Sequence, residues 1–325
     1  MNSLLVKLNT ARDLTGRPDY EDLKRRDPWE KQIRALRSEI VKKYGGQNVT
    51  KAWLKMYELL STTPLGAHLL SNMRPVRVFL NAEFPGGFLY AINHYLQTRG
   101  QVPEWVMSSF LPRDPTNKNF LGDELHIVEK YPARVLVGKI ATNKGSFWSD
   151  GDLTNPKVPA ILAQLARSKY PEYDLYTADG GFDVSGQEND QETLSIPLIT
   201  GEVDTGVKVL GKGGNMVLKI FTFFTPEMRS LLVYLMRLFD QFDIIKPNTS
   251  GPLNSESYFV GIGFKGNPQS RQMLTPTVQE EQFLNAKMEK LVNTQINNIY
   301  QFFQGKSVPL NVNLELLALD RSKQL

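Results

Sequence analysis

The sequence predicts an α/β fold in which helices cover both faces of a mostly parallel sheet. Strand-like apolar runs alternate along the chain with segments that repeat apolar residues at helical spacing. Two glycine turns, at residues 85–87 and 179–181, each follow a strand-like run. The chain has 325 residues, of which 41% are hydrophobic, so it can bury a sizeable core. Several strand–helix units in succession are typical of a sheet that is covered on both sides.

Two amphipathic helices are expected before the first strand. Residues 28–46 repeat apolar side chains at intervals of three and four, and they end at a glycine pair that suits a helix C-cap. Residues 50–61 begin with Thr50, a good N-cap residue, and carry Lys55 on a charged face. This pattern alone favours a solvent-exposed position for Lys55.

The first strand–turn–helix unit is expected at residues 76–98, where the apolar run 76–81 leads through Pro85, Gly86 and Gly87 into a helix. This is the first unit of a doubly wound sheet. The turn lacks the full G-x-G-x-x-G spacing, so it is weak evidence of a ligand site by itself.

The alternation of strands and helices continues to the end of the chain. Further helices are expected at residues 158–170, 190–210 (with a bend at Pro197), 226–239 and 278–303. Further strands are expected at residues 173–178, 215–221, 242–247 and 257–264.

The strand at 173–178 ends on Asp179, Gly180 and Gly181. Loops at the carboxyl ends of α/β strands form the binding crevice, although the same residues also suit a simple tight turn. Because both glycine turns follow strands, they can meet at one edge of the sheet and hold a nucleoside-containing ligand between them.

Composition excludes several classes of site. The chain has no cysteine, which excludes disulfides and thiolate metal sites, and its three histidines lie far apart in the sequence. No apolar run is long enough to span a membrane, and the N-terminus has too short an apolar stretch for a signal peptide. We therefore expect an intracellular protein with no membrane partner. The formal net charge of +4 suits a nucleic-acid partner but is shared by many proteins without one.

Five sequence blocks, in their order along the chain, resemble the FtsJ-like (RrmJ-type) ribose 2′-O-methyltransferases, in the branch that methylates the first nucleotides of capped mRNA. The blocks are NAEFPGGF, SDGDLTNP, YTADGGFDVSGQENDQE, GGNMVLKIFTFFTP and KPNTSGPLNSESYFVG. Together with VTKAWLKMYELLST, they most resemble the FtsJ-like proteins of large cytoplasmic DNA viruses such as the African swine fever group.

The resemblance implies a Rossmann-like methyltransferase fold with a mostly parallel, seven-stranded sheet. It covers about residues 48–265, which implies a methyltransferase domain over that range. A helical N-terminal extension at 1–47 and a mainly helical C-terminal extension at 266–325 are expected around it.

The resemblance also implies a Lys-Asp-Lys-Glu catalytic tetrad, whose positions here are filled by Lys55, Asp179, Lys219 and Glu256. Residue context alone singles out only Lys219, because a lysine inside the apolar run 216–221 is costly to bury without a partner. Taken alone, Asp179 suits a turn and Glu256 suits pairing with a surface lysine.

The implied reaction transfers a methyl group from S-adenosylmethionine to a ribose 2′-hydroxyl, which must be aimed in line and relieved of its proton. No metal is needed in this scheme. Lys219 can act as the base only if its pKa falls, which burial and Lys55 favour and the two carboxylates oppose. The sequence leaves open whether Lys219 removes the proton or the tetrad only orients the hydroxyl.

S-adenosylmethionine is the implied cofactor, and the resemblance assigns candidate contacts to it. Pro85, Gly86 and Gly87 would let the backbone approach its methionine portion, Asp152 would accept hydrogen bonds from the adenine amino group, and Asp179 would border the transferable methyl.

One departure from the family pattern affects the cofactor site. Where relatives commonly carry an aspartate, this chain has Leu80, and Glu83 and Phe84 replace small residues before the proline. Asn81 and Glu83 are the candidate substitutes for the missing contact.

Capped mRNA is the implied partner, with other capping or transcription proteins as further candidates. Lys24, Arg25 and Arg26 are candidates for phosphate contacts, and Trp148 for stacking on a base or the cap guanine. A solvated basic run and a packed loop aromatic are the alternatives.

Two other functions remain open from the sequence. One is a ribosomal or transfer RNA 2′-O-methyltransferase, and the other is a non-catalytic RNA-binding or scaffold subunit with the same fold. The expected location is the host cytoplasm (viral factory) or the virion for a viral protein, and the nucleus or cytoplasm otherwise.

Overall fold

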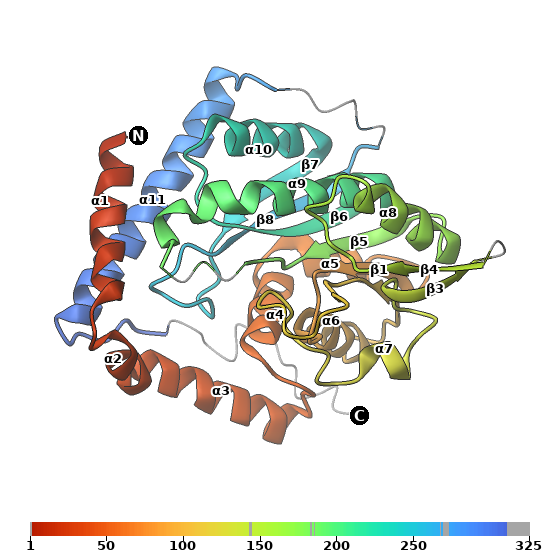
Figure 1. Ribbon diagram of the computed structural model, residues 1–325, viewed down its shortest axis with the longest axis horizontal. Coiled ribbons are helices and arrows are strands. Elements are labelled where there is room, and N and C mark those ends of the chain that lie inside the picture. The colour runs from red at the N-terminus through yellow and green to blue at the C-terminus, as the bar shows by residue number, and fades with distance from the viewer. Residues whose placement is uncertain are drawn as a thin grey trace.

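The computed structural model describes residues 2–142, 145–182, 184, 186–266, 268 and 273–310, and it places a sheet at the centre of the molecule (Figure 1). Six strands among these residues form the sheet in the order β2-β1-β5-β6-β8-β7. Their bounds are β1 Val76–Asn81, β2 Pro103–Met107, β5 Tyr173–Ala178, β6 Leu210–Ile220, β7 Phe239–Ile245 and β8 Ser257–Phe264. Five of these strands run in the same direction, and β8 runs in the opposite direction, antiparallel to both β6 and β7. The predicted α/β fold with a mostly parallel sheet is confirmed.

The predicted count of seven strands is wrong for the described part of the sheet, which has six. Beside β2, where a seventh strand would lie, the structure has only a single parallel bridge between Met107 and Val135. Parallel pairing with the rest of β2 would need residues 131–134, but there the chain forms a turn in which the Arg134 N–H donates to the Tyr131 carbonyl at 2.9 Å. The chain then continues into an antiparallel hairpin of β3 Gly138–Thr142 and β4 Gly145–Ser149, which the sequence analysis did not predict.

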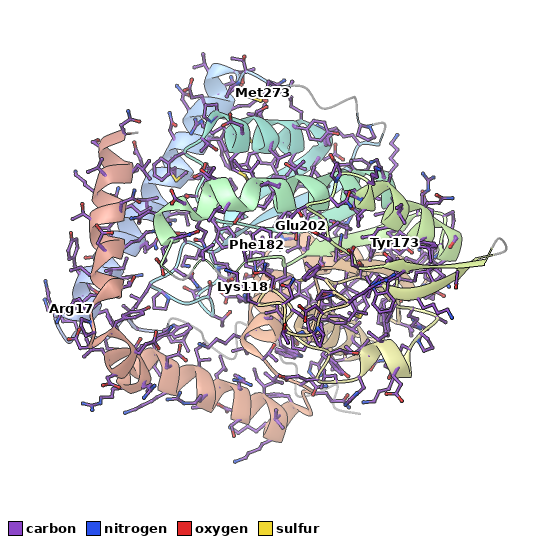
Figure 2. All side chains as sticks on the ribbon, in the orientation of Figure 1. Arg17, Lys118, Tyr173, Phe182, Glu202 and Met273 are labelled. Carbon is purple, nitrogen blue, oxygen red and sulfur yellow. The ribbon has the colours of Figure 1, made fainter. Side chains whose placement is uncertain are left out.

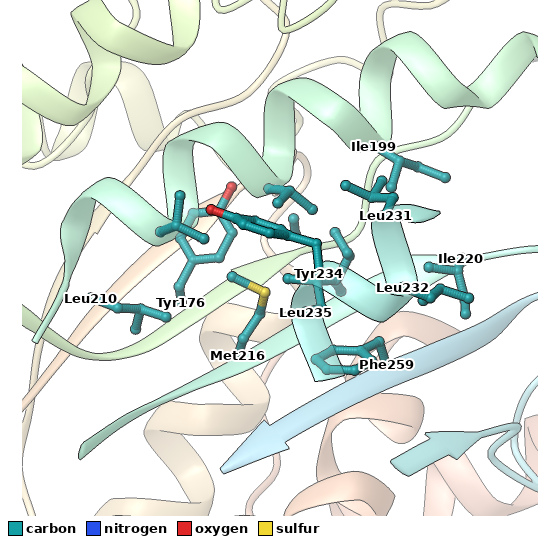
Figure 3. Close-up of a cluster of buried hydrophobic side chains, with 14 of the residues drawn as sticks. Tyr176, Ile199, Leu210, Met216, Ile220, Leu231, Leu232, Tyr234, Leu235 and Phe259 are labelled. Carbon is teal, nitrogen blue, oxygen red and sulfur yellow. The ribbon is translucent and has the colours of Figure 1, made fainter. Parts of the chain in front are cut away.

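Helices cover both faces of the sheet, as predicted. Figure 1 shows α8 (Val158–Lys169), α9 (Gln191–Val209) and α10 (Pro226–Leu238) on one side. On the other side it shows α4 (Lys51–Thr62), α5 (Pro64–Leu70) and α6 (Gly87–Gln97). Each face buries its own apolar core, and Figure 3 shows Met216 of β6 and Phe259 of β8 packed beneath α9 and α10.

Alternation within the strands explains the two cores. In β1, Phe79 packs in the core under α8, α9 and α10, whereas Val78 and Leu80 pack in the core under α4, α5 and α6. A strand that is buried on both faces must be apolar at nearly every position. The continuous run VRVFLN meets that requirement.

Helices at both ends of the chain pack together. The N-terminal helices are α1 (Asn2–Asp13), the short turn η1 (Leu14–Gly16), α2 (Tyr20–Arg26) and α3 (Pro28–Tyr44). Near the C-terminus, α11 (Val278–Phe303) lies alongside α1 (Figure 1). The short helix α7 (Ile127–Lys130) completes the set of α-helices in the described residues.

Local caps fix where the terminal helices begin and end. The Asp27 carboxylate accepts a hydrogen bond from the Trp29 N–H at the start of α3, and Gly45 ends that helix at φ +66°. At the start of α11, Thr277 and Glu280 form a reciprocal capping box. None of the helices in the described ranges is long and apolar enough to cross a membrane.

Candidate active site

Four charged residues from four separate elements meet at the carboxyl ends of β5 and β6. Lys55 lies on α4, Asp179 directly follows β5, Lys219 is the penultimate residue of β6, and Glu256 directly precedes β8. Their side chains are only 10–14% exposed.

Strand alternation determines the direction of Lys219. Its neighbours Leu218 and Ile220 pack in the core under α9 and α10, so Lys219 points to the opposite face, on which α4 lies. Lys219 also lies directly across from Tyr258 of β8.

The four charges form one continuous chain of ion pairs. Lys219 Nζ lies 3.3 Å from Asp179 Oδ1 and 4.0 Å from Glu256 Oε2. Lys55 Nζ donates to Glu256 Oε1 at 2.9 Å. The structure therefore brings together all four residues that the sequence assigned to a tetrad, and the expectation of a solvent-exposed face for Lys55 does not hold.

Electrostatics keep Lys219 and Glu256 ionised. Burial lowers the pKa of Lys219, but the negative charges of Asp179 and Glu256 outweigh burial, so that the pKa is raised overall. Burial likewise raises the pKa of Glu256, but the charges of Lys55 and Lys219 prevail and lower it to about 2. Lys219 is therefore an ammonium ion, and Glu256 a carboxylate, at neutral pH.

A cavity of about 230 Å³ opens beside the tetrad at the carboxyl ends of β1, β2 and β5. This edge is where open α/β sheets bind ligands. Asp152 and Thr154 line one wall of the cavity, and Asp179 and Gly181 line another. Asp179 thus contacts Lys219 on one side and the cavity on the other.

Residues 48–264 match the FtsJ-like methyltransferase family. This match spans well over half of the chain. The chain belongs to the FtsJ-like methyltransferase family. The resemblance that the sequence blocks indicated is thereby confirmed.

Three relatives illustrate the similarity. The chain is 34% identical over 295 residues to a probable methyltransferase, EP424R, of African swine fever virus, with 88% of this chain and 66% of the relative covered. It is 28% identical over 278 residues to cap-specific mRNA (nucleoside-2′-O-)-methyltransferase 2 of Mus musculus, with 83% and 35% covered. It is 28% identical over 233 residues to protein L511 of Acanthamoeba polyphaga mimivirus, with 71% and 28% covered. The chain thus spans about two thirds of the swine fever virus relative and about a third of the mouse relative.

The residues that the family resemblance assigned to cofactor contacts divide into two groups. Asp152 and Asp179 line the cavity. Asn81 is fully buried, where its Nδ2 donates to the Tyr176 hydroxyl at 3.0 Å. Glu83 is 3% exposed and accepts the Leu89 N–H at 2.8 Å, and burial raises its pKa. Both side chains hold the β1–α6 connection in place, and a direct role for them in cofactor binding stays a prediction.

The glycine turn after β1 has a packing role of its own. Gly86 adopts φ +106° at the N-cap of α6, a conformation that glycine reaches without strain. A Cβ on Gly87 would lie 2.7 Å from Thr50 Oγ1 at the start of α4, so only glycine fits there. With Pro85, this turn docks α6 against α4 and so helps to position Lys55. Its contact with a cofactor also stays a prediction.

The turn after β5 needs its glycines because the backbone approaches two functional groups. A Cβ on Gly180 would lie 2.3 Å from Glu202 Oε1, and the Gly180 N–H donates to that oxygen at 3.0 Å. A Cβ on Gly181 would lie 3.3 Å from Lys219 Nζ. Glu202 is fully buried in α9, and burial raises its pKa to about 8 (Figure 2). The sequence analysis missed Glu202, because nothing in its helical context distinguishes it.

Tyr258 is a second site residue that the sequence analysis missed. Its hydroxyl donates to Asp179 Oδ1 at 2.7 Å, and its ring lies 5.6 Å from Lys55 Nζ. The signal was available in the sequence, because Glu256 directly precedes the strand and Tyr258 follows two residues later, a spacing that places both on one side of an extended segment.

Glu58 is a third missed residue, one helical turn after Lys55 on α4. Its carboxylate accepts four hydrogen bonds of 2.8–3.0 Å, two from Asn248 and two from Thr249. In the same loop, Ser250 Oγ donates to Glu256 Oε1 at 2.9 Å. Helix α4 therefore carries Lys55 and also holds the loop that leads to Glu256.

The candidates for RNA contact lie in different parts of the molecule. Lys24 lies on α2 and lines a second cavity that also includes Lys55, whereas Arg25 and Arg26 do not line it. Trp148 lies on β4 of the β3–β4 hairpin, and its side chain is 39% exposed. The Arg113 guanidinium lies 5.6 Å from its ring. Within the described ranges, no group of three or more histidine, aspartate or glutamate side chains is arranged to hold a metal ion.

Proposed function

We propose that this chain is an S-adenosylmethionine-dependent RNA 2′-O-methyltransferase that acts near the 5′ end of capped mRNA. The observation that carries the proposal is the position of Asp179, which contacts Lys219 of the charged cluster and also lines the cavity at the strand ends. A methyl donor in that cavity would therefore lie directly beside the lysine that meets the ribose hydroxyl. The cap-specific mRNA methyltransferase among the relatives supports the choice of substrate.

The residues of the cavity fit an adenosine-containing cofactor. Asp152 Oδ1 is held by the N–H and the hydroxyl of Thr154, at 3.0 and 2.7 Å, which fixes its carboxylate at the cavity wall. A fixed carboxylate is a suitable acceptor for the adenine amino group or for ribose hydroxyls. When bound, S-adenosylmethionine supplies a methyl group attached to a positively charged sulfonium, and this sulfur becomes a neutral thioether once the methyl group is transferred.

The tetrad binds and orients the ribose 2′-hydroxyl in this proposal. Lys219 is an ammonium ion because Asp179 and Glu256 raise its pKa, so it donates a hydrogen bond to the 2′-oxygen and stabilises negative charge there. Lys55 and Glu256 hold Lys219 in place from the other side. The hydroxyl becomes more acidic as its oxygen bonds to the methyl carbon, and its proton then passes to solvent water. Orientation and charge stabilisation are thus the roles assigned to Lys219.

The proposal is tested by methyl transfer from radiolabelled S-adenosylmethionine to RNAs that differ only in the presence of a 5′ cap. Nuclease digestion and mass spectrometry then locate the label on base or ribose. Label on a ribose near the 5′ end of the capped RNA alone is the expected result. Equal label on uncapped ribosomal or transfer RNA would replace mRNA as the substrate, and no label on any RNA together with no cofactor binding would favour a scaffold subunit.

A further inference from the structure

A groove of about 600 Å³ extends from the tetrad toward the N-terminal helices. Lys55 and Glu256 line its inner end, and Arg17 and Lys24 line its outer end. The family match begins at residue 48, so the outer wall belongs to a part of the chain that the family does not account for.

We propose that this groove holds the RNA strand beside the methylated ribose, and that Arg17, Lys24 and Lys51 bind its phosphates. This inference rests on the proposed function, because it takes RNA as the substrate of the tetrad. It adds that the N-terminal helices form part of the RNA-binding surface.

The inner wall of the groove is the loop at residues 249–256, and helices from both ends of the chain hold it. Arg12 of α1 is 7% exposed, and its guanidinium donates to the Ser255 hydroxyl and, at 3.0 Å, to the Glu188 carbonyl. Gln295 of α11 is 4% exposed and donates to the Leu253 carbonyl at 2.9 Å. Ser255 in turn donates to Gln295 Oε1 at 2.7 Å.

The outer wall is fixed at the end of α11. The Tyr20 ring packs edge-on against Phe302, with 5.9 Å between ring centroids. The Arg17 guanidinium lies 5.0 Å from the ring centroid of Phe303, at the edge of the molecule (Figure 2). Because both walls are anchored, the groove exists before any ligand binds, which lowers the entropic cost of binding.

The groove is lined by five basic side chains (Arg12, Arg17, Lys24, Lys51 and Lys55) and by five carboxylates (Glu21, Asp27, Glu30, Glu188 and Glu256). Binding of a polyanion therefore depends on exposed basic groups that can exchange a carboxylate partner for a phosphate. Lys51, Lys24 and Arg17 are spread from the tetrad end to the outer end, and their side chains are 44–48% exposed. Each is paired in the free chain with a carboxylate: Glu30 at 2.6 Å, Glu21 at 3.7 Å and Asp19 at 2.8 Å respectively. The Arg17–Asp19 and Lys24–Glu21 pairs are exposed on both sides, and such pairs contribute only about 0–1 kcal/mol, so a phosphate can replace the carboxylate there at little cost.

A charge-reversal pair on α2 tests the groove directly. Lys24→Glu changes a groove residue, and Arg25→Glu changes its neighbour on the same helix, whose side chain is 77% exposed outside the groove. The net charge changes equally in both variants, so a difference between their Kd values for RNA depends on whether the altered residue lies in the groove. Fluorescence anisotropy with a labelled capped RNA of about ten nucleotides measures the Kd over a range of salt concentrations.

We expect Lys24→Glu to raise the Kd for RNA about tenfold at low salt. The plot of the logarithm of the binding constant against the logarithm of the salt concentration should become shallower by about 0.7, which is the value for one phosphate contact in a single strand. Arg25→Glu should change the Kd less than about twofold, because exposed charges far from the ligand are screened. Both variants should bind S-adenosylmethionine like the unaltered chain. Arg17→Glu should behave like Lys24→Glu.

The failure of this inference is distinguishable from the failure of the proposed function. If the unaltered chain methylates RNA while Lys24→Glu, Arg17→Glu and Arg25→Glu all bind RNA equally, the groove assignment is wrong and the methyltransferase stands. If the unaltered chain methylates no RNA but Lys24→Glu still weakens RNA binding selectively, the groove assignment stands and the activity is wrong.

Discussion

Replacement of Glu202 by glutamine should remove a pH-dependent loss of stability. Glu202 is fully buried, its Oε1 accepts the Gly180 N–H, and burial raises its pKa from 4.5 to about 8. Above pH 4.5 the unfolded chain therefore releases a proton that the folded chain keeps. By linkage, stability falls as the pH rises from about 4.5, and the fall ends near pH 8, where the folded chain also ionises.

The magnitude follows from the pKa shift. Each pH unit between the two pKa values corresponds to about 1.4 kcal/mol, so the change from pH 5 to pH 7.5 is about 3 kcal/mol. Glutamine keeps the oxygen that accepts the Gly180 N–H but does not titrate, so the Glu202→Gln variant avoids this loss. The other ionisable groups are shared. Glu202 contributes to the raised pKa of Lys219 and of Tyr176, but both groups titrate above this pH range and so do not affect the comparison.

Urea-induced unfolding at several pH values measures the effect. The free energy of unfolding of the variant, minus that of the unaltered chain, should increase by about 3 kcal/mol between pH 5 and pH 7.5. A difference that stays constant within about 0.5 kcal/mol, the usual scatter of such comparisons, would refute the claim that Glu202 is a neutral acid in the folded chain.

Three further variants test other parts of the site. Glu58→Ala leaves the N–H groups of Asn248 and Thr249 without acceptors, so the free energy of unfolding should fall by about 2–5 kcal/mol. An unchanged midpoint of urea-induced unfolding would contradict this. Tyr258→Phe removes the hydrogen bond to Asp179 and should lower kcat up to about tenfold, with little change in KM for RNA. An unchanged kcat in steady-state assays would show that this hydrogen bond does not contribute to catalysis. Asp152→Ala should weaken cofactor binding about tenfold in calorimetry, and an unaltered Kd would place the cofactor elsewhere.

Much of the fold was predictable because it depends on local signals. The apolar run at β1 and the Thr225–Pro226 start of α10 are patterns of neighbouring residues, and the structure has an element at each. The absence of a seventh strand from the described sheet was not predictable in this way, because it depends on the turn at residues 131–134, which limits the pairing with β2 to a single bridge at Val135. The β3–β4 hairpin was missed because its strands are short and because β4 is exposed at four of its five residues, so it lacks the apolar run of a buried strand.

The candidate site was predictable to the extent that family motifs mark it. The four tetrad positions came from the resemblance, and only Lys219 stood out by its apolar context. The contacts that support them join residues far apart in the chain, such as Glu58 with Thr249 and Arg12 with Ser255. Local periodicity carries no information on such pairs. The same limit applies to the RNA groove, whose walls come from the N-terminal helices and from the loop at residues 249–256.

The central claim is that Lys219 carries methyl transfer, and single-turnover kinetics with saturating S-adenosylmethionine and capped RNA test it most directly. Lys219→Met removes the charge from the tetrad, and Lys212→Met, an exposed position on the same strand, is the matched control. We predict that Lys219→Met slows methyl transfer at least about a hundredfold while cofactor and RNA still bind, and that Lys212→Met leaves the rate unchanged. A Lys219→Met rate within about threefold of that of the unaltered chain would contradict the account, because it corresponds to a change of less than about 1 kcal/mol in the activation free energy.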